Sequence, residues 1–131
     1  MYQLRGKLSI VMPAYNEEAL IYNSIMQTLS IVEQFAPDLE IIAVNDGSKD
    51  KTKQEIERAI RDDAKQPHPV VPGMRVSGTR IKLVTSNKNR GKGNAIISGI
   101  SQAEGDYIAF VDADLELNPA QLKGYLKKMQ E

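Results

Sequence analysis

The sequence contains no cysteine and no tryptophan, and its single histidine is His68. Without cysteine, disulfides, thiol nucleophiles and cysteine-zinc sites are excluded. His68 lies between two prolines, where we expect a solvated loop residue. Because no second histidine is present, a Ser-His-Asp arrangement has no other imidazole to use. These absences exclude several common classes of active site.

The sequence also lacks an excess of charge of either sign and lacks any long apolar run. Lys and Arg total 17, as do Asp and Glu, so the formal net charge is zero. A nucleic-acid partner bound through a dominant basic field is therefore not expected, and a local basic patch stays open. No apolar run approaches the ~18 residues of a membrane span, and no secretory signal is visible. We expect a cytoplasmic protein, or one held at the cytoplasmic face of a membrane by segments outside this sequence.

What remains is an ordinary globular composition. The 131 residues are 41% hydrophobic and 26% charged, which is too apolar for a disordered chain. This length permits one hydrophobic core. We therefore predict a single domain over residues 1–131.

Apolar runs and helical periodicities alternate along the chain. Runs closed by turn residues predict strands at 8–12, 39–44, 81–85 and 107–111, the last buried on both faces. Apolar residues at helical spacing predict helices from Asn16 to Phe35, over 51–64, over 95–103 and from Pro119 onward. The alternation predicts an α/β, Rossmann-like fold: a mostly parallel sheet with helices on both faces.

Further details of these elements can be predicted from single residues. Pro13 is expected to end the first strand, and Asn16 and Asn118 are expected to be helix N-caps. Gly105 is placed as the C-cap of the third helix. The loop at 66–79 is expected to be exposed. The buried sides of the last two helices are predicted to be Ala95, Ile96, Ile97, Ile100 and Ala103, and Leu122, Tyr125, Leu126 and Met129.

A polar cluster follows each predicted strand. The clusters span residues 14–18, 45–50, 88–92 and 112–116. In parallel α/β sheets, ligands bind at the carboxyl ends of the strands. We therefore expect four loops, distant in sequence, to line one cleft.

The cluster after the fourth strand carries two carboxylates one residue apart, Asp112 and Asp114. Like charges so close repel, and burying either is costly without a compensating cation. Mg²⁺ and Mn²⁺ take oxygen ligands and often join a few carboxylates to phosphates. Our hypothesis is that Asp112 and Asp114 hold such a metal beside a nucleotide pocket.

Residues of the other clusters each allow two interpretations. Asp46 could accept a ring N–H of a base, or it could form an Asx turn. Tyr15 could flank the base or be a partly buried core tyrosine. Glu17 could bond a base edge or a ribose hydroxyl, or it could be a helix-dipole acid. Arg90 and Lys92 could neutralise a diphosphate, or they could form a solvated basic turn.

Taken together, four segments resemble the signatures of family 2 glycosyltransferases, in the order of that family. They are residues 9–18, 44–50, 89–95 and 111–114. The family comprises inverting enzymes with the GT-A fold, and the closest resemblance is to polyprenyl- (dolichyl-) phosphate sugar synthases. The resemblance implies transfer of a hexose from a UDP- or GDP-sugar, with Mg²⁺ or Mn²⁺, to a lipid-phosphate acceptor.

The resemblance also implies roles for individual residues. Asp112 and Asp114 would be the catalytic, metal-holding pair, with Glu116 as a further metal ligand. The nucleotide would be bound by Pro13, Ala14, Tyr15, Glu17, Asp46, Gly47, Arg90, Lys92 and Asp112. Because the family's acceptor site lies downstream of the metal motif, we expect a truncated GT-A domain that is inactive or weakly active alone.

Three alternatives stay open at this point. The chain could be a non-catalytic nucleotide-binding or assembly module, or part of an enzyme that glycosylates a hydroxyl group on a polysaccharide or protein glycan. A nucleotidyltransferase would instead bind a nucleoside triphosphate and a sugar phosphate. An open edge on the fourth strand could also pair with another copy, giving a homo-oligomer.

Overall fold

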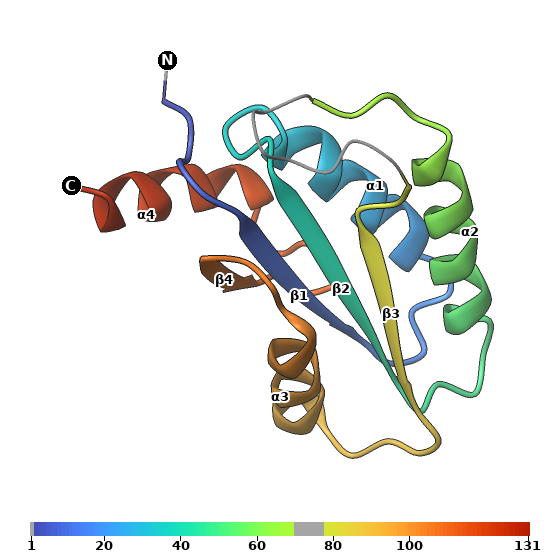
Figure 1. The fold of residues 1–131 in the computed structure, drawn as a ribbon. Helices are drawn as coiled ribbons and strands as arrows, with labels where there is room; N and C mark the ends of the chain where they lie inside the picture. The colour runs from blue at the N-terminus through green and yellow to red at the C-terminus, as the bar shows by residue number, and fades with distance from the viewer. Residues whose placement is uncertain (1, 70–77) are drawn as a thin grey trace.

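The computed structural model describes residues 2–69 and 78–131 and has the predicted α/β fold. Its four strands are all parallel, in the order β3-β2-β1-β4 (Figure 1). A 3₁₀ helix, η1 (Pro119–Gln121), leads directly into the last α-helix. The other elements are β1 (Leu8–Ala14), α1 (Ile21–Val32), β2 (Leu39–Asp46), α2 (Thr52–Ala64), β3 (Ile81–Ser86), α3 (Lys92–Gln102), β4 (Tyr107–Phe110) and α4 (Leu122–Met129).

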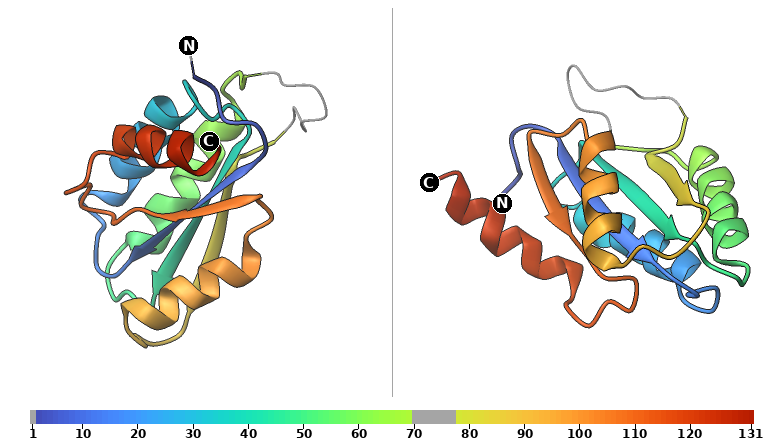
Figure 2. Two further views of the ribbon diagram at one scale, coloured as in Figure 1. Left: turned by 90° about the vertical axis from the view of Figure 1, so that its left-hand side faces the viewer. Right: turned by 90° about the horizontal axis from the view of Figure 1, so that it is seen from below.

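Helices cover both faces of the sheet, as predicted. α1, α2 and α4 lie on one face and α3 lies on the other (Figure 2). Because successive side chains of a strand point to opposite faces, Ile10 and Ile41 belong to the larger core cluster, whereas Val11 and Ile42 pack in the smaller one with Ala95 of α3. Both faces of the central strands are therefore buried from solvent, which explains their continuous apolar runs. In the two described ranges, no helix is long and apolar enough to cross a membrane.

The predicted end of β1 at Pro13 is wrong, because the strand continues to Ala14. Pro13 is in register with Val44 of β2. On its other side, β1 pairs with β4 only as far as Val11, which is opposite Phe110. Beyond Val11 no β4 carbonyl needs a donor, so a proline is tolerated there.

The predicted N-cap of the first helix is also wrong. α1 begins at Ile21, and Asn16 lies in the preceding loop with a φ of 52°, in the left-handed region. Asparagine tolerates this conformation better than most residues. Its Oδ1 accepts the backbone N–H of Lys49 at 2.9 Å, so a contact between two loops replaces the expected cap.

The prediction that the fourth strand is buried on both faces is wrong. The sheet order places β4 at an edge, and Ile108 and Phe110 are 43% and 53% exposed. α3 packs over β1 and β2 instead of β4. The sequence pattern of an apolar run does not distinguish an edge strand from a central one.

α3 buries a narrower side than its periodicity predicts. Ala95 is buried, but Ile97 and Ile100 are exposed. The helix approaches the sheet through Gly99, where an added Cβ would lie 2.4 Å from a methyl group of Val11. This close approach at a glycine turns the larger isoleucines away from the sheet.

Two predicted helix ends have different outcomes. Gly105 is not the C-cap of α3, which is Ala103. Gly105 instead packs against Ser9, whose Oγ would lie 2.6 Å from an added Cβ. Asn118 is confirmed as an N-cap, since its side chain accepts the N–H of Ala120 at 2.9 Å.

On the predicted apolar side of α4, Leu126 is buried. Tyr125 and Met129 are 68% and 67% exposed, so their predicted burial is wrong. α4 packs on the larger core cluster through Leu122 and Leu126. The buried face of α4 is thus narrower than the apolar face that the sequence periodicity predicts.

The expectation of a solvated His68 is wrong. Its side chain is 4% exposed, and Nε2 lies 3.0 Å from the carbonyl oxygen of Gly78. Nearby, the fully buried carboxylate of Asp63 accepts bonds from the Arg80 guanidinium at 2.7 Å and from the Arg80 N–H at 2.8 Å. This cluster lies at the amino end of β3. Most of the loop predicted to be exposed, residues 70–77, lies outside the described residues.

Candidate functional site

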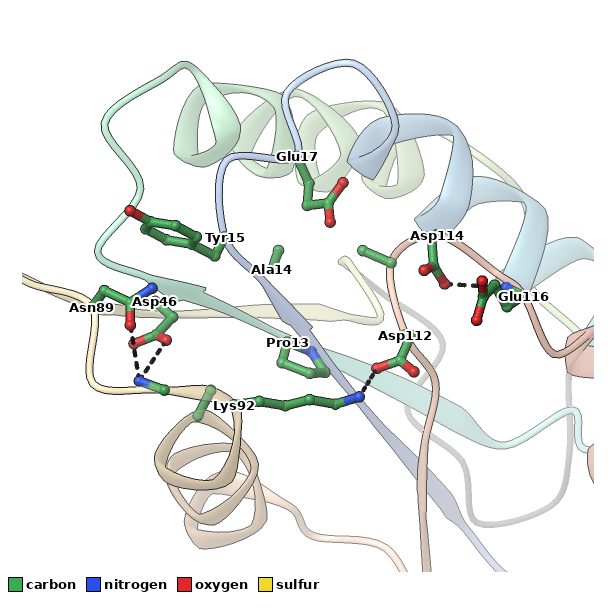
Figure 3. A pocket seen from close by; sticks show the side chains of 13 residues that line it. Pro13, Ala14, Tyr15, Glu17, Asp46, Asn89, Lys92, Asp112, Asp114 and Glu116 are labelled. Atoms are coloured by element: carbon green, nitrogen blue, oxygen red, sulfur yellow. Dashed lines mark hydrogen bonds and ion pairs between the residues drawn. The ribbon is translucent and has the colours of Figure 1, made fainter.

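A cavity of about 480 Å³ opens at the carboxyl ends of the strands (Figure 3). Side chains from all four predicted polar clusters contribute to it, so the expected convergence of distant loops is present. The sheet order explains the position: the chain runs outward from β1 to β3 and then returns to the other side of β1. The lining residues are Pro13, Ala14, Tyr15, Glu17, Asp46, Asn89, Gly91, Lys92, Ala95, Asp112, Ala113, Asp114 and Glu116.

The first wall of the cavity is held by contacts between the loops after β1 and β2. The N–H of Asn16 donates to Ser48 Oγ at 2.9 Å, and the N–H of Glu17 donates to Thr52 Oγ1 at 2.8 Å. Tyr15, between Ala14 and these contacts, is 42% exposed. It is a lining residue of the cavity, and the alternative of a core tyrosine is wrong.

Asp46, the last residue of β2, connects the base of the cavity to the loop after β3. It is 4% exposed, and its carboxylate accepts the backbone N–H groups of Arg90 at 2.9 Å and Gly91 at 3.0 Å. The alternative of an Asx turn at Asp46 is wrong. The neighbouring Asn45 makes a comparable local bond instead, since its Oδ1 accepts the N–H of Ser48 at 3.2 Å. The strand is two residues longer than predicted, which places Asp46 inside the ladder.

Two predicted nucleotide-binding residues do not line the cavity. Gly47 has a φ of +69°, and an added Cβ would lie 2.2 Å from the carbonyl carbon of Lys88. It permits the close crossing of two loops. Arg90 is exposed and contributes its backbone N–H to Asp46.

Conversely, the cavity includes residues that sequence reasoning did not assign. Asn89 lines it, and its Oδ1 accepts the N–H of Gly91 at 3.0 Å. Ala95, one turn into α3, forms part of the same wall. The sequence prediction for this loop relied on its basic residues, Arg90 and Lys92. The shape of the cavity wall depends also on Asn89 and on the small residue Ala95.

The opposite wall is acidic. Asp114 Oδ1 accepts the N–H of Glu116 at 3.1 Å, and the Ser24 hydroxyl of α1 donates to the carbonyl of Ala113. Glu17 faces this wall across the cavity (Figure 3). Burial raises the pKa of the Glu17 carboxyl above its ordinary value, and the negative charges of Asp114 and Asp50 raise it further.

Lys92, the first residue of α3, contacts this acidic wall. Its Nζ lies 2.6 Å from Asp112 Oδ1. The hydrogen bond to Asp112 raises the pKa of the Lys92 ammonium, and the charges of Asp112, Asp114 and Glu116 add to the effect. The lysine therefore stays protonated and balances part of the negative charge.

The acidic wall has suitable chemistry for a divalent cation, because carboxylate oxygens are the ligands that Mg²⁺ and Mn²⁺ prefer. The acidic side chains of this wall do not, however, form a ready set of metal ligands. Within residues 2–69 and 78–131, no three acidic or histidine side chains are grouped closely enough to hold a metal ion. Asp112, Asp114 and Glu116 line one cavity, but Asp112 is engaged by Lys92.

A parallel sheet with a polar cavity at the carboxyl ends of its strands is the arrangement in which α/β domains bind their ligands, nucleotides among them. Residues 9–131 match the family described as Glycosyl transferase family 2, and the chain belongs to this family. Undecaprenyl-phosphate 4-deoxy-4-formamido-L-arabinose transferases are among its curated relatives. The protein from Enterobacter sp. (strain 638) is 34% identical over 95% of this chain, and that from Pseudomonas fluorescens (strain SBW25) is 33% identical over 88%. The chain spans 34% and 30% of their respective lengths.

Solved structures share the fold. The mannosyltransferase PcManGT from Pyrobaculum calidifontis, in complex with GDP-Man and Mn²⁺, superposes with a TM-score of 0.74 at 23% identity. The match covers 97% of this chain and 33% of that protein. S. aureus TarS in complex with UDP-GlcNAc gives a TM-score of 0.65 at 25% identity, over 95% of this chain and 31% of TarS. The predicted GT-A type of fold is therefore confirmed.

Proposed function

We propose that this chain is the donor-binding part of an inverting, metal-dependent glycosyltransferase. It would take a hexose or related sugar from a UDP- or GDP-linked donor and pass it to a polyprenyl phosphate. The observation that carries the proposal is the single cavity in which Tyr15, Asp46 and Lys92 meet the acidic wall of Asp112 and Asp114. Such a cavity combines groups for a base, a diphosphate and a cation.

The proposed roles follow the chemistry of each wall. Tyr15 and Asp46 would contact the base, with Glu17 near the ribose. Lys92 and the N–H groups at the start of α3 would bind the diphosphate, because a helix N-terminus attracts anions. The negative charge that develops on the leaving diphosphate would be stabilised electrostatically by these groups.

Asp112, Asp114 and Glu116 are the residues that would hold Mg²⁺ or Mn²⁺. A bound cation would supply further charge stabilisation to the leaving diphosphate. The Mn²⁺ of the Pyrobaculum mannosyltransferase complex supports this part of the proposal by similarity of fold.

The proposed acceptor is supported by the names of the curated relatives, which specify undecaprenyl phosphate. A phosphate oxygen is already ionised, so attack on the anomeric carbon would need no protein base. The corresponding location would be the cytoplasmic face of a membrane. A hydroxyl acceptor, in contrast, would require a general base.

Isothermal titration with UDP, GDP and UDP-glucose, each with and without Mn²⁺, tests the proposal. We expect one nucleotide to bind and Mn²⁺ to increase its affinity. Asp114→Asn should remove the metal effect, whereas Asp38→Asn, at the distant amino end of β2, should retain it. Absence of metal-dependent binding would favour a non-catalytic module, and binding of a nucleoside triphosphate with a sugar phosphate would favour a nucleotidyltransferase.

A further inference from the structure

Lys92 pairs with one oxygen of Asp112, a carboxylate that the proposed metal would use. Its Nζ is 2.6 Å from Asp112 Oδ1, and its side chain extends across the cavity toward Asp112 (Figure 3). The two side chains are 61% and 51% exposed, so neither is fixed by packing. The ammonium group at Oδ1 withholds one of the two carboxylate oxygens and repels an incoming divalent cation, so the ion pair disfavours metal binding at Asp112.

Lys92 also stands beside the place where a diphosphate would bind. It is the first residue of α3, and it follows Gly91, which lines the cavity. The unpaired N–H groups and the dipole at a helix start favour phosphate. The long, flexible lysine side chain can therefore reach either the acidic wall or an anion at the helix start.

We propose that Lys92 is an exchangeable counter-ion, a positioning residue that holds Asp112 while the donor is absent and moves to the donor's diphosphate when it binds. This inference rests on the proposed function. The exchange frees Asp112 for the metal at the moment the diphosphate arrives. Donor and metal then strengthen each other's binding, and by linkage the effect is equal in both directions.

The test is a titration of Mn²⁺ into four proteins, with and without saturating UDP: wild type, Lys92→Met, Lys92→Arg and Lys88→Met. Lys88 is exposed in the same loop and outside the cavity lining, so its substitution is a control for net charge. Circular dichroism confirms that each variant is folded.

In the free protein, we expect Lys92→Met to bind Mn²⁺ about two- to fivefold more tightly than wild type, the strength of an exposed ion pair. Lys88→Met should change the affinity less. With UDP bound, the gain of Lys92→Met should disappear, because the wild-type lysine has then left Asp112. Lys92→Met should also bind UDP more weakly, and Lys92→Arg should resemble wild type.

Two results would overturn the exchange while leaving the proposed function intact. Equal tightening by Lys92→Met and Lys88→Met would mean that Lys92 acts only through net charge. A gain that persists unchanged with UDP would mean that Lys92 does not move. If the wild type binds neither UDP nor GDP, with or without Mn²⁺, the proposed function fails and the exchange fails with it.

Discussion

The carboxylate of Asp46 accepts the backbone N–H of Gly91 at 3.0 Å, across 45 positions of the sequence. With the second bond, from the N–H of Arg90 at 2.9 Å, it fixes the loop after β3 against the end of β2. A buried acid that satisfies two backbone donors determines the shape of the cavity before any ligand is present. Asp46 is therefore a structural residue of the site in addition to its proposed contact with the base.

Asp46→Asn should weaken both the fold and the site. An asparagine offers one acceptor oxygen and turns an NH₂ group toward the other backbone donor, which should cost about 1–3 kcal/mol of unfolding free energy. The loosened loop should also lower the affinity for UDP. Urea unfolding and nucleotide titration measure the two effects, with Asp38→Asn as the matched control. Wild-type behaviour in both assays would contradict this role.

Gly47→Ala should be strongly destabilising, because Gly47 has a φ of +69° and no room for a side chain beside Lys88. The left-handed conformation and the overlap together should lower the free energy of unfolding by about 2–4 kcal/mol. Thermal unfolding measures the loss. Gly124→Ala is the control: nothing lies within 4 Å of an added Cβ there, and α4 should gain about 1 kcal/mol in helix propensity. Equal melting temperatures for both variants would refute the explanation.

Stability should fall in acid because of the buried pair of Asp63 and Arg80. Burial alone would raise the pKa of the Asp63 carboxyl, but the hydrogen bonds and charge of Arg80 outweigh it and hold this pKa below its ordinary value. A lowered pKa means that the folded state favours the ionised form. The resulting stabilisation is fully present above the unfolded pKa of about 3.9 and is lost as the pH falls through the folded pKa.

Urea unfolding between pH 7 and pH 2.5 measures this dependence. Asp63→Asn should cost about 3 kcal/mol at pH 7, since the buried guanidinium of Arg80 loses the charge of its buried partner and keeps its ion pair with Glu33, 2.8 Å away. The difference from wild type should shrink in acid. A constant difference across the range would show that the ion pair is not the cause.

The open edge of β4 should make the chain self-associate. Ile108 and Phe110 are exposed there, and an unpaired apolar strand edge is a site for pairing with another strand. We expect concentration-dependent association in light scattering after size exclusion. Phe110→Lys should reduce it, whereas Met129→Lys, on the exposed side of α4, should not. A concentration-independent monomer of the wild type would contradict the homo-oligomer prediction.

Local sequence features predicted most of the elements well, but failed where a contact came from a distant segment. Asn16 has the residue type of an N-cap, yet its side chain serves Lys49 of another loop. His68 has the setting of a loop residue, yet its Nε2 lies 3.0 Å from the carbonyl oxygen of Gly78, ten positions along the chain. In each case the contacting residue lies outside the few neighbouring positions that periodicity and capping rules consider.

The amino-acid sequence by itself determined the alternation of strands and helices, the family signatures, and the four polar clusters at strand ends, because these depend on residue type and spacing along one segment. Only the tertiary structure decided that β4 is an exposed edge, that Asp46 holds the loop of Gly91, and that Lys92 pairs with Asp112. Those relationships depend on strand order and on side chains that meet from different loops. They fix the state of the acidic wall before a ligand binds: its carboxylates are present, and one of them is already held by a lysine.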